Sequence, residues 1–145
     1  MLAIGSDHGG LSLKETIKQQ LTDMNIEFKD YGTYSTESVD YPEYGAKVAR
    51  AVASGECERG IIICGTGIGI SIAANKIKGI RAALCNDVFS AQMSREHNDA
   101  NILALGERVT GPGLAQMIVE KWLTTPFAGG RHARRVEKLM ALEEE

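Results

Sequence analysis

The sequence lacks the features that would place the chain in a membrane, in a disulfide framework or on a nucleic acid. No apolar run approaches the roughly 18 residues of a membrane span. No basic segment precedes the first apolar residues, so we expect a cytoplasmic protein. Three cysteines, an odd number at wide spacing, indicate neither a disulfide framework nor a zinc site. A formal net charge of −3 gives no electrostatic case for nucleic-acid binding.

Short apolar runs alternate along the chain with segments of helical periodicity. The 145 residues suit one domain, 1-145, and the content of 43% hydrophobic and 24% charged residues is ordinary for a globular protein. Strands are predicted at residues 2–6, 26–31, 60–64, 81–85 and 101–105. Helices are predicted at residues 11–24, 42–52, 70–76, 88–96, 112–122 and 131–142.

This alternation is typical of an α/β protein. It predicts a five-stranded parallel sheet covered by helices on both faces, which is a doubly wound, Rossmann-like αβα sandwich. Its crossovers are expected to be right-handed. Ligands of such sheets bind beyond the carboxyl ends of the strands, near a topological switch point. The pattern does not determine the order of the strands.

The most informative segment reads GIIICGTGIGISIAAN, where an apolar run ends at Cys64. The glycine-rich turn that follows contains Gly65, Thr66, Gly67 and Gly69. Such a turn presents unpaired backbone N–H groups at a helix N-terminus, where the helix dipole favours negative charge. The segment therefore predicts a reactive sulfur beside an anion site. The alternative is a tight strand–helix turn in which glycine serves the backbone alone.

The turn does not match the common phosphate motifs. No Gly-Lys-Ser/Thr follows it at the spacing of a P-loop. The third small residue of a dinucleotide fingerprint is replaced by Ile70. No metal-ligand spacing occurs in the sequence either, so no metal is expected.

Titratable side chains occur next to the predicted strand ends. Asp7 and His8 follow the first strand, and His97 and Asn98 precede the fifth. Each has a structural alternative: Asp7 suits a helix N-cap, His8 a surface histidine, and His97 with Asn98 a helix C-cap. Cys57 and Cys85 are interpreted as inert residues of a loop and of a buried strand.

Three arginines lie on the last predicted helix. Arg131 and Arg135 are one turn apart, on the face that Arg134 also shares. Guanidinium groups match phosphate oxygens bidentately, so the first interpretation is a phosphate clamp. The alternative is a solvated basic patch. Together with the thiol, the carboxylate and the histidines, the arginines suit proton transfer on a small phosphorylated carbon skeleton.

These residues belong to motifs that recur together in one known family. The motifs are Ser6-Asp7-His8-Gly9-Gly10, Asp40-Tyr41-Pro42, the segment from Cys64 to Lys76, His97-Asn98-Asp99 and Gly129-Gly130-Arg131-His132. In this order and spacing the chain resembles ribose-5-phosphate isomerase type B, whose family includes galactose-6-phosphate and allose-6-phosphate isomerases. The resemblance covers essentially the whole chain, and the cysteine turn is its most specific part.

The resemblance implies interconversion of D-ribose 5-phosphate and D-ribulose 5-phosphate through a cis-enediolate, in the pentose phosphate pathway and without metal or cofactor. Cys64 would move the proton between C2 and C1, and Asp7 would move the hydroxyl proton between O1 and O2. His97, with Thr66, would assist opening of the furanose ring. Members without the cysteine carry a glutamate further along the loop, but here Ile70 and Ser71 are not acidic.

The resemblance also implies how the substrate is bound. Backbone N–H groups around Gly65, Gly67 and Gly69 would hold the enediolate oxygen, and Asn98 would bind a sugar oxygen. The remaining substrate-binding residues implied are Tyr41, which would line the pocket, and, for the phosphate, His8, Arg131 and Arg135, with Arg108 contributing.

The same resemblance implies a homodimer, in some members a tetramer, whose pockets form across the interface. His97, Asn98 and Arg108 would then serve the neighbouring subunit's site, and helix 131–142 would contribute to the site or the interface. The expected ligand is a sugar phosphate, with no nucleic acid and no membrane.

Three other functions stay open at this stage. Within the family, the chain suits an allose-6-phosphate or galactose-6-phosphate isomerase. Outside it, the alternatives are a non-catalytic sugar-phosphate-binding module and an enzyme with a thiol nucleophile, which would need a histidine within reach of Cys64.

Overall fold

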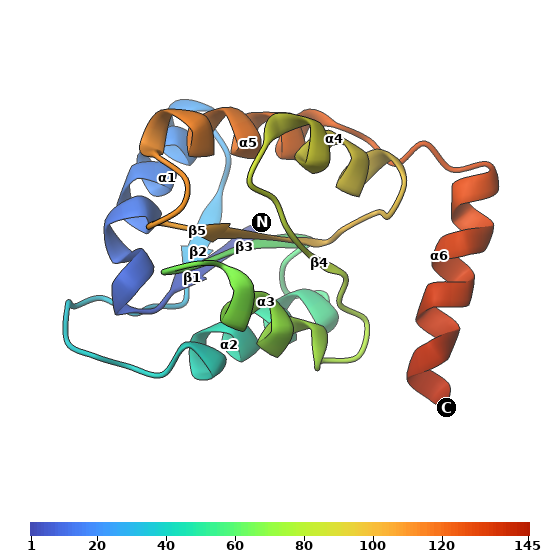
Figure 1. Ribbon diagram of the computed structural model, residues 1–145, viewed down its shortest axis with the longest axis horizontal. Coiled ribbons are helices and arrows are strands. Elements are labelled where there is room, and N and C mark those ends of the chain that lie inside the picture. The colour runs from blue at the N-terminus through green and yellow to red at the C-terminus, as the bar shows by residue number, and fades with distance from the viewer.

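The computed structural model describes residues 1–145 and contains one parallel sheet between two layers of helices (Figure 1). The strands are β1 Leu2–Ser6, β2 Phe28–Asp30, β3 Arg59–Cys64, β4 Ala82–Leu84 and β5 Ile102–Gly106. The α-helices are α1 Leu11–Asp23, α2 Tyr41–Ala53, α3 Ile68–Asn75, α4 Val88–Glu96, α5 Pro112–Thr124 and α6 Arg131–Ala141. Short 3-10 turns cover His8–Gly10 and Leu142–Glu144. The predicted doubly wound fold is confirmed.

The strand order is β2-β1-β3-β5-β4, and every neighbouring pair is parallel. The chain builds β2 on one side of β1, crosses back to β3, and then adds β4 and β5 on the other side. The direction of winding therefore reverses between β1 and β3. In open α/β sheets ligands bind outside the carboxyl ends of the strands at such a point.

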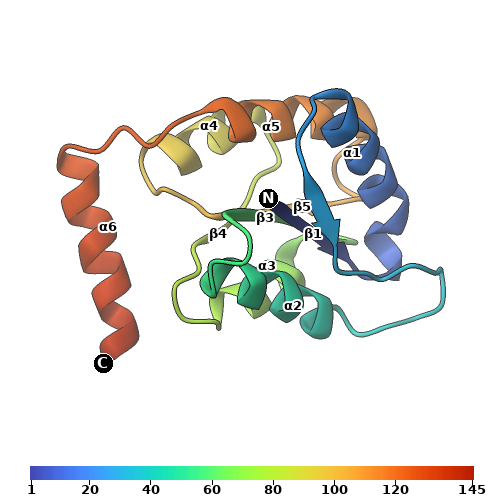
Figure 2. The ribbon, with the colours of Figure 1, turned by 180° about the vertical axis from the view of Figure 1, so that it is seen from behind.

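Both faces of the sheet are buried, which explains the unbroken apolar run of β3. Ile61 and Ile63 pack into the cluster beneath α1 and α5, which also holds Trp122. Ile62 and Cys64 point to the opposite face and pack with α2 and α3. Figure 2 shows the same layers from behind, with α1, α4 and α5 on one face and α2 and α3 on the other. Side-chain alternation along one buried strand thus serves two cores.

Some predicted boundaries shift for local reasons. The second strand is shorter than 26–31, because at this edge of the sheet only Phe28–Asp30 pairs, with β1 as its one neighbour. The fourth strand is also an edge strand and keeps three residues. The third helix begins at Ile68, two residues earlier than predicted, directly after Gly67 in a left-handed conformation.

The last helix, α6, lies apart from both layers, beside one end of the sheet (Figures 1 and 2). None of its residues is buried. The predicted helix 131–142 is confirmed, with its last turn as a 3-10 turn from Leu142.

Candidate functional site

Cys64 is the last residue of β3 and is only 5% exposed. The Gly67 backbone N–H donates to its Sγ at 3.1 Å. Gly67 has φ +79°, and a Cβ there would lie 2.9 Å from the carbonyl carbon of Leu105. Both the backbone angle and the close approach of β5 therefore require glycine. The turn is built tightly enough to fix the sulfur.

The same turn leaves backbone donors without partners. The N–H groups of Gly65, Thr66, Gly69 and Ile70 have no acceptor in the chain, while that of Ile68 is used by Thr66 Oγ1 at 3.2 Å. Unpaired donors at the start of α3 can accept an anion or a developing oxyanion. Every helix start leaves such N–H groups unpaired, so the turn also fits the alternative in which glycine serves the backbone alone.

Asp7 lies next to this turn, at the carboxyl end of β1. It is 7% exposed, its N–H donates to the Ile63 carbonyl at 3.2 Å, and its Oδ1 accepts from the Gly10 N–H at 3.1 Å. The N-cap interpretation is therefore confirmed. The cap uses one of the two carboxylate oxygens. A Cβ on Gly9 would meet both Asp7 Oδ1, at 3.4 Å, and the Gly65 nitrogen, at 3.5 Å, so the two turns are in contact.

Three further predicted residues join Cys64 and Asp7. Val39 N–H donates to His8 Nδ1 at 3.1 Å, which leaves Nε2 as the donor of a neutral imidazole. The Tyr41 ring lies against Gly69, because a Cβ there would come within 2.6 Å of Cε1. Arg108 lies beside Gly65 of the same chain, 3.6 Å from the position of a Cβ. We call Asp7, His8, Tyr41, Cys64, residues 65–69 and Arg108 the cysteine cluster.

The other predicted residues form a second group between α4 and α6. The rings of His97 and His132 stack, with centroids 4.2 Å apart and planes 12° from parallel. They border a recess of about 390 Å³ lined by His97, Asn98, Arg131, His132, Arg135, Val136 and Leu139. Arg134 is not part of this lining. We call His97, Asn98, Arg131, His132 and Arg135 the arginine cluster.

The arginine cluster is strongly positive and exposed. Desolvation, and then the charges of His97, Arg131 and Arg135, lower the pKa of His132 below its ordinary value. None of the ion pairs of the chain involves Arg131 or Arg135. Two unpaired guanidinium groups one helical turn apart suit a dianionic phosphate.

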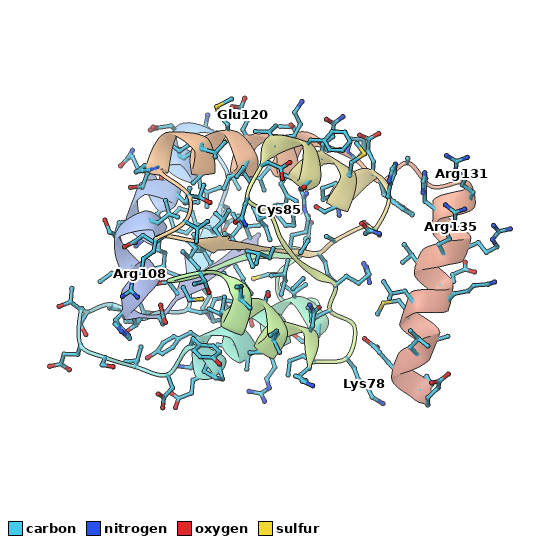
Figure 3. All side chains as sticks on the ribbon, in the orientation of Figure 1. Lys78, Cys85, Arg108, Glu120, Arg131 and Arg135 are labelled. Carbon is cyan, nitrogen blue, oxygen red and sulfur yellow. The ribbon has the colours of Figure 1, made fainter.

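One copy of the chain does not bring the two clusters together. The N-cap of α4, Asp87, follows the carboxyl end of β4, and the helix then runs back along the sheet, so His97 arrives at the amino ends of the strands. Arg108 follows the carboxyl end of β5. Figure 3 shows Arg108 at one end of the molecule and Arg131 and Arg135 at the other.

Two features of the arginine cluster are missing from the sequence-based prediction. His132 was quoted only as part of a motif, and no periodicity indicates that its ring meets His97 of another helix. His97 is the C-cap of α4, as its structural alternative predicted, but the left-handed residue that follows is Asp99, at φ +48°, and not Asn98. Asp and Asn both tolerate this conformation, so the pattern HND alone does not distinguish them.

The other cysteines are structural. Cys57 and Cys85 are 1% and 2% exposed. Burial raises the pKa of the Cys85 thiol to about 11, which keeps it protonated and unreactive. No group of three or more His, Cys, Asp or Glu side chains is arranged to hold a metal ion, and no helix is both long and apolar enough to span a membrane.

A doubly wound α/β fold with unpaired N–H groups beside a buried thiol, and with two unpaired arginines on one helix, is typical of a protein that binds a small phosphorylated ligand. Comparison with known proteins gives the family: residues 2–139 match the model of the Ribose/Galactose Isomerase family. This chain therefore belongs to that family, and the resemblance seen in its sequence is confirmed.

Full-length relatives agree. The chain is 54% identical to ribose-5-phosphate isomerase B of Escherichia coli (strain K12), covering 99% of this chain and 96% of the relative. The solved structure of Clostridium thermocellum ribose-5-phosphate isomerase B is 62% identical, with a TM-score of 0.97, and the match covers 99% and 97% of the two chains. That of the Mycoplasma genitalium enzyme with bound ribulose-5-phosphate is 38% identical, with a TM-score of 0.95 and coverage of 99% and 96%.

Proposed function

We propose that this chain is a ribose-5-phosphate isomerase, which interconverts D-ribose 5-phosphate and D-ribulose 5-phosphate in the pentose phosphate pathway of the cytoplasm. The observation that carries the proposal is a buried cysteine held inside an anion-binding turn, with Cys64 Sγ 3.1 Å from the Gly67 nitrogen and free N–H groups on both sides. A base beside an oxyanion cradle is what proton transfer next to a carbonyl requires.

The reaction follows from these groups. The Cys64 thiolate takes the proton from C2 of the open-chain aldose, and the electron pair moves onto O1. The resulting enediolate oxygen is stabilised by the unpaired N–H groups of Gly65, Thr66, Gly69 and Ile70, while the predicted Gly67 N–H is already donated to Cys64 Sγ. The Asp7 carboxylate carries the proton from the O2 hydroxyl to O1. The Cys64 thiol then returns its proton to C1, which yields the ketose with every atom accounted for and the thiolate restored.

Ring opening and binding fall to the other members of the site. His97 and Thr66 move a proton between the C1 hydroxyl and the ring oxygen of the furanose. Asn98 binds a sugar hydroxyl, and Tyr41 lines the pocket against Gly69. Arg131, Arg135 and the Nε2–H of His8 hold the phosphate, with Arg108 contributing. No metal or cofactor takes part in these steps, so exhaustive chelation should leave turnover unchanged.

The working enzyme is proposed to be a homodimer with shared sites. The separation of the two clusters supports this, because Arg108 lies at one end of the molecule and Arg131 and Arg135 lie at the other (Figure 3). A second copy would present its His97, Asn98, Arg131 and Arg135 to the Cys64 of the first. The exposed, unpaired arginines of α6 and the absence of buried residues in that helix support the same assembly. Arg108 lies with the cysteine cluster of its own chain.

The direct test is a steady-state comparison of ribose 5-phosphate, allose 6-phosphate and galactose 6-phosphate. We expect the largest kcat/KM for ribose 5-phosphate. A larger kcat/KM for either six-carbon substrate would reassign the enzyme within the family. Binding of all three without turnover would instead favour a sugar-phosphate-binding module.

A further inference from the structure

Arg81 contacts both the turn that carries Asn98 and, at Met140, the helix α6 that carries Arg131 and Arg135. It directly precedes β4, and its side chain is 18% exposed. Its Nη1 donates to Met140 Sδ of α6 at 3.4 Å. Its Nε donates to the carbonyl oxygens of Asn98, at 3.2 Å, and Asp99, at 3.0 Å. One guanidinium thus joins the turn that carries Asn98 to the helix that carries the phosphate arginines.

The turn after α4 needs such support. The last carbonyls of a helix have no partners within it, and here the chain also adopts a left-handed conformation at Asp99, at φ +48°. Arg81 Nη2 donates to the Asp99 carbonyl at 2.8 Å, and the same nitrogen lies 3.6 Å from Asp99 Oδ2. The planar, forked guanidinium group of Arg81 makes these contacts simultaneously. The ammonium group of a lysine cannot reproduce them.

A second arginine holds the same turn from the opposite side. Arg95 Nη1 donates to Asp99 Oδ1 at 2.9 Å and to the Ala100 carbonyl at 2.7 Å. Its Nε donates to the Thr125 carbonyl at 3.2 Å, where the linker to α6 begins. The Asp99 carboxylate therefore stands between two guanidinium groups. The contacts of Arg81 thus reach α6 itself, and those of Arg95 reach the start of the linker to α6.

We propose that Arg81 is a positioning residue of the isomerase, which sets the distance between the ring-opening side of the arginine cluster, His97 and Asn98, and its phosphate side, Arg131 and Arg135. The proposal rests on the proposed function. With the phosphate fixed on α6, the location of the turn decides whether the furanose ring meets His97. Arg81 touches neither substrate nor reacting atoms and acts through the Asn98 turn.

The test compares Arg81→Lys with a matched control, Arg59→Lys. Arg59 also donates to two backbone carbonyls, those of Trp122 at 3.3 Å and Leu123 at 3.2 Å, but these carry no site residue. Wild-type turnover of ribose 5-phosphate is measured first, because its absence would remove the proposed function itself. We then expect Arg81→Lys to lower kcat/KM by about 10- to 100-fold, the usual effect of a misplacement near 1 Å. Arg59→Lys should lower Tm by a similar amount, but its kcat/KM should stay within about 3-fold of the wild-type value.

A double-mutant cycle separates positioning from general destabilisation. If Arg81 acts through Asn98, Arg81→Lys should lower kcat/KM much less when it is added to Asn98→Ala than when it is introduced into the wild-type chain. Unchanged kcat/KM in Arg81→Lys, an equal loss in Arg59→Lys, or fully additive losses with Asn98→Ala would each overturn the proposal. If Arg81→Lys does not fold, Asp99→Asn replaces it in the same measurements, and the same three outcomes would overturn the proposal. Asparagine tolerates the left-handed conformation, so this variant loses only the charge between the two guanidinium groups.

Discussion

At the scale of single residues, the proposed chemistry depends on one sulfur, that of Cys64. The Sγ of Cys64 accepts a hydrogen bond from the Gly67 N–H at 3.1 Å, and neither Cys57 nor Cys85 has a hydrogen bond to the glycine turn. We expect Cys64→Ala to lower kcat by about 10²- to 10⁴-fold, the usual contribution of a general base. Circular dichroism and thermal unfolding should show that the variant is folded.

Cys85→Ala is the matched control for this prediction. Cys85 is buried, and its raised pKa of about 11 keeps it out of the chemistry. Its replacement should lower Tm but leave kcat near the wild-type value. A folded Cys64→Ala protein with undiminished kcat would mean that another group removes the C2 proton.

The two arginines of α6 allow binding to be separated from chemistry. The phosphate is remote from C1 and C2, so its contacts serve ground state and transition state alike, and their loss appears mainly in KM. We expect Arg131→Ala and Arg135→Ala each to raise KM for ribose 5-phosphate, at a cost of about 1.5–3 kcal/mol per charged hydrogen bond. The fall in kcat should be smaller.

Arg134 supplies the control, because it lies on the same helix but does not line the recess. Arg134→Ala should change KM little, which distinguishes a specific phosphate site from the general positive charge of the helix. Equal increases of KM in all three variants would favour the solvated basic patch.

At the scale of elements, α1 is tied to β2 by a buried ion pair. The Lys14 side chain is fully buried, and its Nζ donates to Asp30 Oδ1 at 2.7 Å and to the Thr33 carbonyl at 2.5 Å. Asp30 Oδ2 lies 3.0 Å from Lys18 Nζ. Thr33 in turn donates its N–H to the Ser6 carbonyl, directly before Asp7. The Lys14–Asp30 pair thus helps to hold the segment at Thr33 against the carboxyl end of β1.

This pair gives a stability prediction with a defined pH dependence. Burial works to raise the pKa of the Asp30 carboxyl, but hydrogen bonds from Lys14, the Gly32 N–H and Lys18 outweigh it and lower the pKa below its ordinary value. A lowered folded-state pKa adds stability above the unfolded pKa of about 3.9, and the contribution is lost as the pH falls toward the folded-state value.

We therefore expect Asp30→Asn to lose about 3–5 kcal/mol of unfolding free energy at pH 7, because it leaves Lys14 buried without a counterion. The difference from wild type should shrink below a pH of about 4, where Asp30 begins to take up a proton. Chemical denaturation at several pH values measures both. Glu56→Gln, which breaks the exposed pair with Lys29, should cost less than about 1 kcal/mol, and a loss as small for Asp30→Asn would contradict the prediction.

At the scale of the whole molecule, the two clusters lie at opposite ends of one chain, and the proposed homodimer would bring them together in shared sites (Figure 3). Cys64→Ala and His97→Asn should each be nearly inactive, since each removes one half of every shared site. Unfolding and refolding a mixture of the two should restore activity. Random pairing makes half of the dimers mixed, and each has one intact site of two, so we expect about a quarter of wild-type turnover.

The control is a mixture of two variants of the same cluster, Cys64→Ala with Asp7→Asn. These changes fall in the same half of the site, so neither site of a mixed dimer is intact and no recovery is expected. Differently tagged subunits would verify that mixed dimers form. If the mixed dimers of Cys64→Ala and His97→Asn stay inactive, Cys64 and His97 of one copy belong to the same site, and the proposal of shared sites is wrong.

The sequence by itself determined the layers of the fold and the local chemistry. Buried parallel strands such as β3 are apolar throughout, and amphipathic helices between them leave few alternatives to a doubly wound sheet. The cysteine turn was also predictable, because the left-handed backbone at Gly67 and the free N–H groups are local features of a strand–helix turn, although the close approach of Leu105 to Gly67 is not. Asp7 as a cap follows from the same kind of local contact.

Only the tertiary structure decided the strand order and where the distant residues lie. Which strands become neighbours depends on packing across the sheet, since every parallel order satisfies the same hydrophobic pattern. The stack of His97 on His132 and the fork of Arg81 join helices and strands far apart in the chain, so no spacing encodes them. Because α4 runs antiparallel to the strands, His97 lies at the amino ends of the strands, whereas Cys64 lies at the carboxyl end of β3, so the predicted site residues fall at two ends of one chain.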